Sequence, residues 1–375
     1  MTAYLPFARP LVDEAMIAAV AETLRSGWIA SGPRVLEFER ALSDYHGSRP
    51  TRVFTSATAA LEVALQVCGI GRGDEVVTSA MTFFSVGNMI RKCGATAVFV
   101  DCDLESRNMQ AGAVLAVLTT RTRAIVPTHF GGLACDMDAL LALAGERALR
   151  VIEDAALAIG SCWKGRRIGA FGDITTFSFH PNKNMTTIEG GAAVFANEAE
   201  ARRAEALRFH GIRRLADGTR DVDCAGGKFN LSDVSARLGL AQLERLDGWC
   251  ARRRGLADRY FARLEGKSAV ALPARAHPGE PEGHSWNMFS VRLPLERMAM
   301  TRKAFIDAMH ARGIGIGISY EAMHLTTLFR EAGHREGEFP NAERIARETV
   351  SLPLHAAMGE EDVDRVCDAL EELVP

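Results

Sequence analysis

Three stretches of the chain carry polar residues of the kinds that hold and transform a charged organic ligand. In TSATAALEVAL (residues 55–65), small hydroxylated residues precede a helix-like run. VIEDAALAIG (residues 151–160) is an apolar run interrupted by two adjacent carboxylates. FSFHPNKNMTTIEGG (residues 177–191) contains one of only six lysines in the chain. Each stretch has both a structural and a chemical interpretation.

The first stretch is suited to binding phosphate. A helix N-terminus presents free N–H groups and the positive end of the helix dipole. Ser56, Ala57 and Thr58 would supply hydroxyl and backbone donors there. The alternative is that Ser56 is simply the N-cap of the helix, and the stretch alone leaves both interpretations open.

The second stretch places a carboxylate at the end of an expected strand. A buried carboxylate is costly unless it is paired, so Asp154 calls for a partner. It would bind a metal, act as a base, hold a protonated ring nitrogen or cap a following helix. Glu153 should point to the opposite face of the sheet, because side chains alternate along a strand.

The third stretch allows three roles for Lys183: a solvated loop charge, a phosphate contact or a covalent catalyst. Pro181 and the glycine pair Gly190–Gly191 favour a shaped loop that lies close to the backbone. His180 is more typical of a structural histidine than of a ligand. No second His or Cys follows at metal-ligand spacing, which argues against a zinc site.

Taken together, the three stretches fit pyridoxal phosphate (PLP). This cofactor needs a phosphate cradle, an anion against its ring nitrogen and a lysine that bonds to its aldehyde carbon. An aromatic side chain stacked on its ring is a common fourth part. Phe83 and Phe84 are candidates for that part, although core packing explains at least one of them.

The elements that must position these residues follow an α/β pattern. Short apolar runs alternate with helix-like segments, which predicts a largely parallel sheet with helices on both faces. Ligands of such sheets collect at the carboxyl ends of the strands. The expected strands are Arg52–Thr55, Glu75–Thr78, Ala97–Val100, Ala124–Pro127, Val151–Asp154, Ile174–Phe179 and Ala192–Phe195, and the expected helices between them include Ala57–Val67, Phe84–Cys93 and Met137–Gly145.

Beyond about residue 235 the pattern changes to that of a smaller α+β domain. We predict a large domain over residues 1–240 and a small C-terminal domain over residues 241–375. The loop Pro273–Gly283 is expected to be exposed. The other elements expected there are a long helical stretch Ser235–Leu264, strand-like segments Trp286–Leu293 and Gly313–Tyr320, a helix Arg302–Arg312 and a terminal helix from Gly359.

Composition excludes several functions. The 375 residues carry a formal net charge of −3, which gives no support for nucleic-acid binding. No apolar run reaches about 18 residues, so we expect no membrane span. The N-terminus lacks the pattern of a signal peptide, and the eight cysteines include no CxxC pair. Reduced thiols and a cytoplasmic location are therefore expected.

At this point a family resemblance becomes specific. The segment EDAA followed by KGRRIGAFGDITTFSFHPNKNMTTIEGGA resembles the DegT-type sugar aminotransferases, which are fold-type I PLP enzymes. The resemblance runs nearly end to end. Within the family, LPFARP and KFNLSD look most like the UDP-4-amino-4-deoxy-L-arabinose aminotransferase type. Other matching segments are SGWIASGP (26–33), GIGRGDEVVTSAMTF (69–83), FHGIRR (209–214), GGKFNLSDVSARLGLAQL (226–243) and FPNAERIARETVSLPLHAAM (339–358).

The resemblance implies a fold-type I homodimer whose active sites are shared between subunits. Lys183 would form the internal aldimine with PLP, and Asp154 would pair with the ring nitrogen. Phe83 would stack on the ring. The phosphate would be held by Ala57, Thr58 and Ser178, with Asn230 arriving from the other subunit. Substrate contacts are expected from Trp28, Arg213, Asn287, Ser319, Tyr320 and His324.

The chain departs from the family near the cofactor. Relatives usually carry Gln or His three residues after the aspartate, where it can bond to the phenolic oxygen of PLP. This chain has Leu157, and the next polar position of the family is Ile159. Near the expected substrate, Asn287 and Ser319 stand where many relatives have histidine. These changes suggest a different sugar, or a carbonyl substrate that is not a sugar.

The leading functional hypothesis is a PLP-dependent aminotransferase that moves an amino group from glutamate to a nucleotide-linked keto sugar. Alternatives are an aminotransferase for a non-sugar carbonyl and a regulatory homologue without turnover. The related sugar dehydratases carry histidine in place of the lysine, so Lys183 argues against that branch. GIGIG (residues 313–317) is weak support for dinucleotide binding, since no helix N-terminus follows it.

Overall fold

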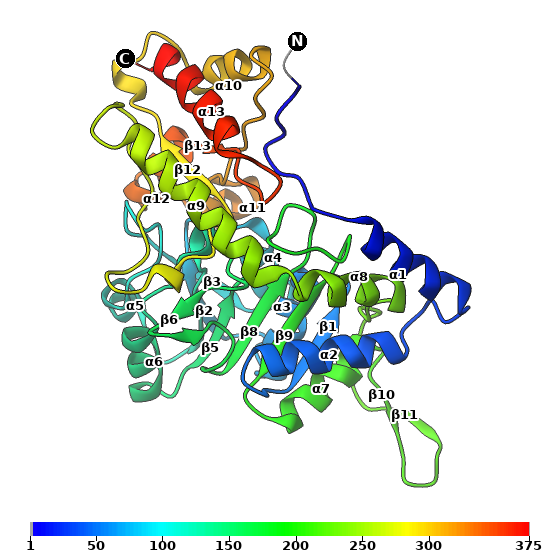
Figure 1. Ribbon diagram of the computed structural model, residues 1–375. Helices are drawn as coiled ribbons and strands as arrows, with labels where there is room; N and C mark the ends of the chain where they lie inside the picture. The colour runs from blue at the N-terminus through cyan, green and yellow to red at the C-terminus, as the bar shows by residue number, and fades with distance from the viewer. Residues whose placement is uncertain (1–2, 375) are drawn as a thin grey trace.

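The structure is a computed structural model that describes residues 3–374. Its larger part is a seven-stranded sheet between two layers of helices (Figure 1). Strand β9 is antiparallel to both of its neighbours, and the other neighbouring pairs are parallel. This confirms the prediction of a largely parallel sheet. In spatial order the strands are β1 (Thr51–Phe54), β9 (Gly191–Phe195), β8 (Ile174–Ser178), β5 (Arg150–Asp154), β4 (Thr122–Val126), β2 (Glu75–Ser79) and β3 (Thr96–Val100).

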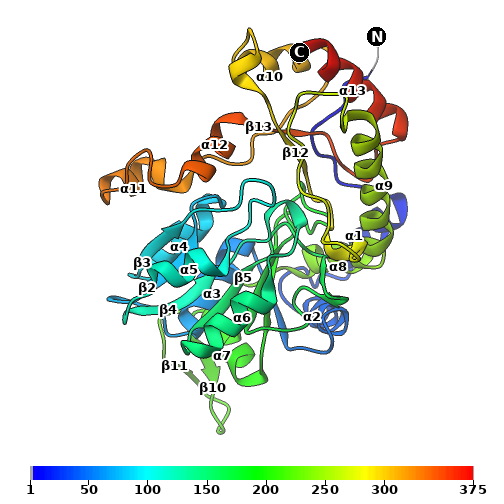
Figure 2. The same ribbon diagram turned by 90° about the vertical axis from the view of Figure 1, so that its left-hand side faces the viewer.

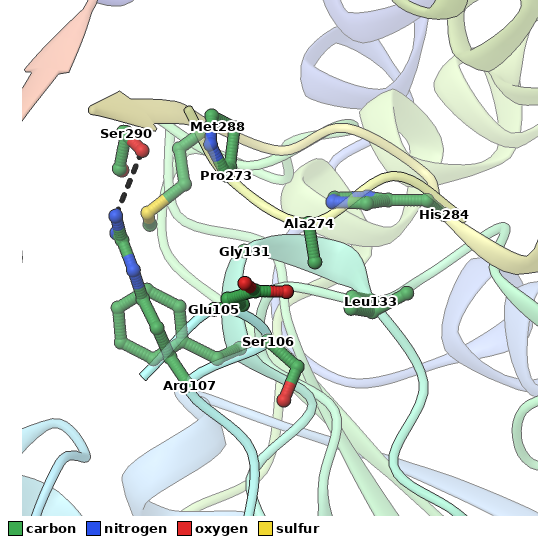
Figure 3. A pocket seen from close by; sticks show the side chains of 11 residues that line it. Glu105, Ser106, Arg107, Gly131, Leu133, Pro273, Ala274, His284, Met288 and Ser290 are labelled. Atoms are coloured by element: carbon green, nitrogen blue, oxygen red, sulfur yellow. Dashed lines mark hydrogen bonds between the residues drawn. The ribbon is translucent and has the colours of Figure 1, made fainter. Parts of the chain in front are cut away.

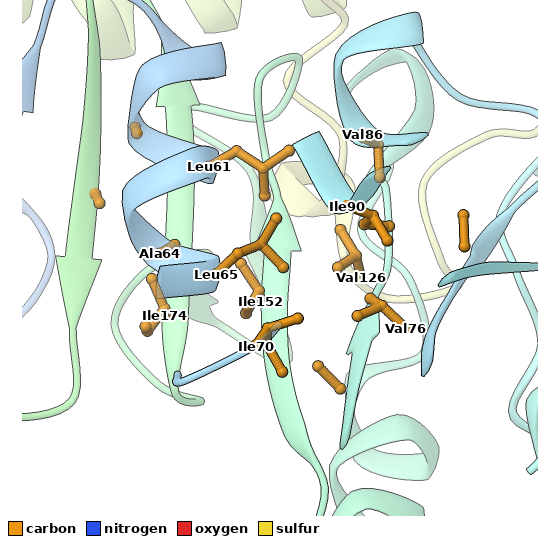
Figure 4. Close-up of a cluster of buried hydrophobic side chains, with 14 of the residues drawn as sticks. Leu61, Ala64, Leu65, Ile70, Val76, Val86, Ile90, Val126, Ile152 and Ile174 are labelled. Carbon is orange, nitrogen blue, oxygen red and sulfur yellow. The ribbon is translucent and has the colours of Figure 1, made fainter. Parts of the chain in front are cut away.

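Alternating residues of each strand serve two separate cores. Val76 packs into one cluster and Val77 into the other, and the same alternation holds along the central strands. Apolar residues on both faces are what a sheet covered on both sides requires. Figure 4 shows the first cluster, in which Leu61 and Leu65 of a helix meet Val126 and Ile152 of the sheet.

Helices with buried apolar residues cover each face. Helix α3 (Ala57–Val67) begins and ends where the sequence predicted. Its start is fixed by Ser56, which caps the N-terminus and accepts from the Ala59 N–H at 3.1 Å. Helices α4 (Phe84–Lys92) and α7 (Glu198–Arg208) cover the same face of the sheet as α3. The opposite face is covered by α2 (Pro33–Tyr45), α5 (Ala111–Val117), α6 (Met137–Glu146) and α8 (Asp233–Leu243). Helix α1 (Glu14–Arg25) packs on α8.

The smaller part is built on helix α9 and one antiparallel strand pair. Its core gathers residues of α9, β12, α10, β13 and α13. Helices α11 and α12 leave this core and lie against β3, where the Phe329 and Phe99 rings are 4.8 Å apart (Figure 2). Its elements are α9 (Leu246–Leu264), β12 (Phe289–Arg292), α10 (Arg302–Ala311), α11 (Thr327–Glu331), α12 (Pro340–Glu348), β13 (Thr349–Leu352) and α13 (Glu360–Leu373).

Three predictions about this part need correction. The expected single helix over residues 235–264 is two helices, α8 and α9, with a break at Glu244 and Arg245. The expected strand Gly313–Tyr320 is an extended segment that makes only single bridges, Ile314 to Leu5 and Gly317 to Ser351. The strand that pairs with β12 is instead β13, which was not predicted.

The N-terminal segment does not follow the predicted division at residue 240. The Leu5 N–H donates to the Gly313 carbonyl at 2.9 Å, and the Gly315 N–H donates to the Leu5 carbonyl at 2.8 Å. The Leu5 side chain is buried in the core of the smaller part. The segment at Leu5 therefore packs with the last third of the chain, although the larger part begins with α1.

The remaining short elements lie at the edges of the sheet. The hairpin of β10 (Ile212–Arg214) and β11 (Arg220–Val222) projects away from the body (Figure 1), and β6 (Cys162–Trp163) pairs with β7 (Arg166–Arg167). None of the helices within residues 3–374 combines the length and the apolar character needed to cross a membrane.

Candidate active site

A cavity of about 230 Å³ opens at the carboxyl ends of the strands. It receives residues that follow β1, β2, β4, β5 and β8, as expected for this class of sheet. The sequence-predicted residues Ala57, Thr58, Phe83, Asp154, Ser178 and Lys183 all line it, together with Ser56, Ser85, Thr128, Ala156, Leu157, His180, Asn182, Glu189, Gly190 and Tyr320.

One end of this cavity is suited to a phosphate group. Ser56 is occupied as the N-cap of α3, while the N–H groups of Ala57 and Thr58 donate to no protein group among residues 3–374. Gly191 of β9 lies so close that a Cβ there would stand 2.4 Å from the Ala57 nitrogen. Both interpretations of Ser56 are thus compatible, since the cap leaves the helix start free to bind an anion.

Asp154 is a buried carboxylate at the end of β5. It accepts from the Ala156 N–H at 3.1 Å and lies 3.5 Å from the Thr128 hydroxyl. No helix follows it, so the capping role considered for it does not apply. Burial raises the pKa of Asp154, because it disfavours the charged form. A cation beside it, such as a protonated pyridine nitrogen, would stabilise the carboxylate.

Glu153 points to the other side of the sheet, as strand alternation predicted. One of its oxygens lies 2.9 Å from His129 Nε2, and the other accepts from the Thr175 hydroxyl at 2.9 Å. The Cys135 N–H donates to His129 Nδ1 at 3.0 Å, so Nε2 carries the hydrogen that Glu153 accepts. The pair is buried and does not reach the cavity.

Lys183 sits in a loop that is fixed on all sides. The Thr186 N–H donates to Gln242 at 3.2 Å, and the Asn184 amide donates to the Ser285 carbonyl at 2.9 Å. The amine of Lys183 has no hydrogen-bond partner among the described residues. Burial lowers the pKa of Lys183 to about 8, against the opposing attraction of Asp154. A partly neutral amine near neutral pH is what a nucleophile or proton carrier requires.

Phe83 and Leu157 give this cavity its apolar surface. Phe83, the residue before α4, is 47% exposed in the chain, although it is a large aromatic side chain. Its position fits the predicted ring-stacking role. Leu157 is 4% exposed and offers no polar atom from its side chain.

A second cavity of about 260 Å³ shares Phe83, Asn182 and Tyr320 with the first. It brings together Asn287 and Ser319, two of the predicted substrate residues. The Asn287 amide donates to the Asn182 carbonyl at 3.3 Å and to Asn184 at 3.2 Å. Its other walls come from both parts of the chain: Phe7, Ala8, Phe84, Met288, Ile318, Glu321, Leu352 and Leu354.

A third cavity, shown in Figure 3, is too small for a cofactor. It measures about 20 Å³, room for little more than one water molecule. Its buried Arg107 donates to the Ser290 carbonyl at 2.8 Å and thereby ties the loop after β3 to β12. Its role in the structure is to join the two parts of the chain.

Three predicted residues line none of the cavities described above. Trp28 is 59% exposed. Arg213 is on the β10–β11 hairpin and pairs with Asp221 at 3.2 Å. Asn230 bonds to Ser31 and Lys228. The roles of Trp28 and Arg213 as substrate contacts, and of Asn230 as a phosphate contact from the other subunit, stay predictions.

His324 does not reach either cavity and needs correction as a substrate contact. It is 0% exposed, and its Nε2 lies 3.0 Å from Glu343 Oε1. Its ring packs edge-on against Phe339 at 4.7 Å. These contacts explain the histidine as part of the packing of α12 against the turn at residues 323–325.

Sequence reasoning missed Thr128. It follows β4 and bridges to Asp154, and its hydroxyl bonds to that of Thr82 at 2.8 Å. A polar residue directly after a predicted strand was the available signal. It was overlooked because the neighbouring strand ends in the more conspicuous carboxylate.

The residues around this cavity therefore fit PLP. They provide a free helix N-terminus, a buried carboxylate and a lysine whose pKa is lowered. An α/β fold with this arrangement defines a PLP-dependent enzyme of fold type I. A profile of the DegT/DnrJ/EryC1/StrS aminotransferase family matches residues 10–371. The chain belongs to this family and is a PLP-dependent aminotransferase.

Relatives of known name span the full length of the chain. The spore coat polysaccharide biosynthesis protein SpsC of Bacillus subtilis is 38% identical, covering 99% of this chain and 97% of its own. Spr1654 of Streptococcus pneumoniae, assigned as a sugar aminotransferase, has a PLP-form structure with TM-score 0.92 at 31% identity over 99% of this chain and 98% of its own.

A relative whose name refers to an aromatic acid is equally similar in structure. 3-Amino-5-hydroxybenzoic acid synthase gives a TM-score of 0.89 at 31% identity, covering 100% of this chain and 99% of its own. The comparisons confirm the family and the fold. They do not single out the UDP-4-amino-4-deoxy-L-arabinose aminotransferase type that LPFARP and KFNLSD suggested.

Proposed function

We propose that this enzyme transfers the amino group of glutamate to a nucleotide-linked keto sugar, in the synthesis of a polysaccharide or of an antibiotic sugar. The observation that carries the proposal is the single cavity that holds Lys183, Asp154 and the start of α3. The names of SpsC and Spr1654 support the sugar class. PLP, when bound, supplies an electron sink for the carbanion formed at the donor carbon.

The residues of the chain would divide the work as follows. The start of α3 and Ser178 would bind the phosphate, and Phe83 would cover one face of the ring. Asp154 would hold the proton on the ring nitrogen. The amine of Lys183 would bind the cofactor covalently and, once released by the donor, would carry a proton to and from the reacting carbon.

Covalent attachment can be tested directly. The purified protein should be yellow, and borohydride should fix PLP to Lys183, as read by peptide mass spectrometry. Lys183→Ala should lose the attachment. A colourless protein that PLP cannot reconstitute would contradict the proposal, and so would stable attachment without any amino transfer, the result expected of a regulatory homologue.

The second candidate is an acceptor that is not a sugar. Asn287 and Ser319, which stand in place of histidines in the second cavity, favour this alternative, and the similarity to 3-amino-5-hydroxybenzoic acid synthase supports it. The pyridoxamine form of the enzyme should be mixed with a panel of nucleotide keto sugars and of cyclic ketones. Consumption of that form by the ketones alone would replace the sugar proposal.

We also propose a homodimer in which Asn230 of the partner subunit completes each phosphate site. Subunits carrying Lys183→Ala and subunits carrying Asn230→Ala should each be impaired alone. In mixed dimers, one of the two sites would have both residues intact, so activity should return. Absence of recovery in a confirmed mixed dimer would place Asn230 at its own subunit's site or at none.

A further inference from the structure

The phenolic oxygen of PLP raises a problem specific to this chain. Its usual partner in relatives is replaced by Leu157, whose side chain is apolar and 4% exposed. Ile159 is also apolar and buried. The Leu157 carbonyl accepts from the Ser285 hydroxyl at 3.3 Å and has no hydrogen to give. A phenolate enclosed in a protein needs a donor, so another residue must be sought.

Chemistry limits where that donor must lie. The phenolic oxygen is on the ring carbon between the one that bears the aldehyde and the one next to the ring nitrogen. With the nitrogen against Asp154 and the aldehyde carbon at Lys183, the oxygen belongs to the part of the cavity that these two residues border. A phosphate bound at Ala57 and Thr58 would lie on the opposite side of the ring.

Tyr320 offers a free hydroxyl to this cavity. Its ring packs against Phe83 at 5.5 Å and against Phe130 at 5.8 Å, which fixes its direction. It lines the cavity together with Asp154, Leu157 and Lys183. Its hydroxyl has no hydrogen-bond partner within residues 3–374. Burial, together with the charge of Asp154, raises the pKa of Tyr320 well above its usual range, so the hydroxyl keeps its proton.

Thr128 and His180 are already engaged, and Asn182, whose amide nitrogen has no partner within residues 3–374, is exposed. The Thr128 hydroxyl bonds to Thr82 at 2.8 Å. The His180 ring bonds through Nδ1 to Asn182 at 2.8 Å. Ser178 and Ser85 are in the cavity, but Ser178 is at the phosphate seat and Ser85 is at the start of α4.

We propose that the Tyr320 hydroxyl donates to the phenolic oxygen of PLP and replaces the donor that Leu157 removes. This inference rests on the proposed PLP chemistry at Lys183 and makes Tyr320 a cofactor-tuning residue as well as a wall of the substrate cavity. The small part of the chain would thus complete the cofactor site of the large part.

The test is the pH dependence of the absorbance of the PLP–Lys183 linkage. A donor on the phenolate withdraws negative charge that otherwise stabilises the proton on the neighbouring linkage nitrogen. Tyr320→Phe keeps the ring packing and removes only the donor. We expect the titration midpoint to rise by about one pH unit, a tenfold tighter hold on the proton. Ser85→Ala, which removes a hydroxyl elsewhere in the cavity, should leave the midpoint unchanged.

A second substitution supplies the rescue. Leu157→Gln in the Tyr320→Phe background restores a donor from the position used by relatives, and the midpoint should return toward that of the wild type. An unchanged midpoint in Tyr320→Phe, with PLP still attached to Lys183, would overturn the inference and leave the proposed function intact. A wild-type protein that never attaches PLP would instead contradict the proposed function.

The inference stays testable even where Tyr320→Phe does not fold. Leu157→Gln alone then decides the question. With Tyr320 already donating, the added amide should move the midpoint by less than about 0.3 pH units. A fall of about one unit would mean that the oxygen had no donor in the wild type, and would overturn the proposal.

Discussion

Lys183 should destabilise the folded protein when PLP is absent. Its amine loses hydration in the cavity, so its pKa falls from the ordinary 10.5 to about 8. At about 1.4 kcal/mol per pH unit, this fall corresponds to a destabilisation of the folded state by about 3 kcal/mol. Water in the open cavity screens part of this, so we expect about 1.5 kcal/mol to be realised. Lys183→Met should therefore make the PLP-free protein more stable at pH 7.

The pH dependence gives this prediction a definite sign. Because the folded pKa lies below the unfolded one, the unfolded chain binds more protons between pH 8 and pH 10.5, and the stability of the wild type rises through that window. The destabilisation is complete below pH 8 and absent above pH 10.5. The advantage of Lys183→Met should accordingly shrink between about pH 7 and about pH 10.

Urea unfolding of the PLP-free proteins at both pH values measures the difference. The matched control is Lys303→Met, where the side chain is 84% exposed and pairs with Asp307 at 2.6 Å. That change should stay within about 0.5 kcal/mol of the wild type at either pH. The reasoning would be refuted by a Lys183→Met protein that is no more stable at pH 7, or by an advantage that does not change with pH.

Three further predictions concern the site and its supports. Asp154→Asn should still attach PLP, but it should slow amino transfer about 10- to 150-fold, because a charge-assisted hydrogen bond is worth about 1.5–3 kcal/mol. Single-turnover kinetics would measure this loss, and an unaffected rate would exclude the proposed role of Asp154. Capture of added PLP by the PLP-free enzyme should accelerate as pH rises through about 8, because only the neutral Lys183 amine reacts, and a flat stopped-flow profile would contradict this. Asp233→Ala should lower the free energy of unfolding, measured in urea, by about 2–4 kcal/mol. The reason is that the buried carboxylate accepts from the N–H groups of Gly32, Arg34 and Val35 at 2.8–3.1 Å. Asp233→Asn, which keeps an acceptor, should lose less stability.

The parts of the fold with strong local signals could be predicted from sequence. Helix α3 has a serine cap before a continuous apolar run, and its predicted bounds match the structure. The central strands are apolar on both faces and are bounded by turn residues, so their positions were also predicted. Asp154 ends such a strand and Lys183 lies in the loop after another, and their place at the sheet edge followed from the topology of parallel sheets.

The failures arise where long-range contacts decide. Residues 313–320 have a strand-like composition, but their neighbours are the N-terminal segment and β13, which no local pattern reveals. The break between α8 and α9 falls at Glu244 and Arg245, neither of which is a helix breaker by type. His324 looked like a ligand until its buried contact with Glu343, nineteen residues away, was visible.

The pairing of Leu5 with Gly313 and Gly315 has a consequence for how the protein is made. Because Gly313 and Gly315 follow far later in the sequence, Leu5 stays unpaired during synthesis until these two glycines have been added to the chain. Phe7 and Ala8, which follow Leu5, line the second cavity with Ser319 and Tyr320. The sheet and the phosphate seat have their partners earlier, during synthesis. The wall of the second cavity at Phe7 and Ala8 is therefore completed after the sheet, and it depends on the pairing of Leu5 with Gly313 and Gly315.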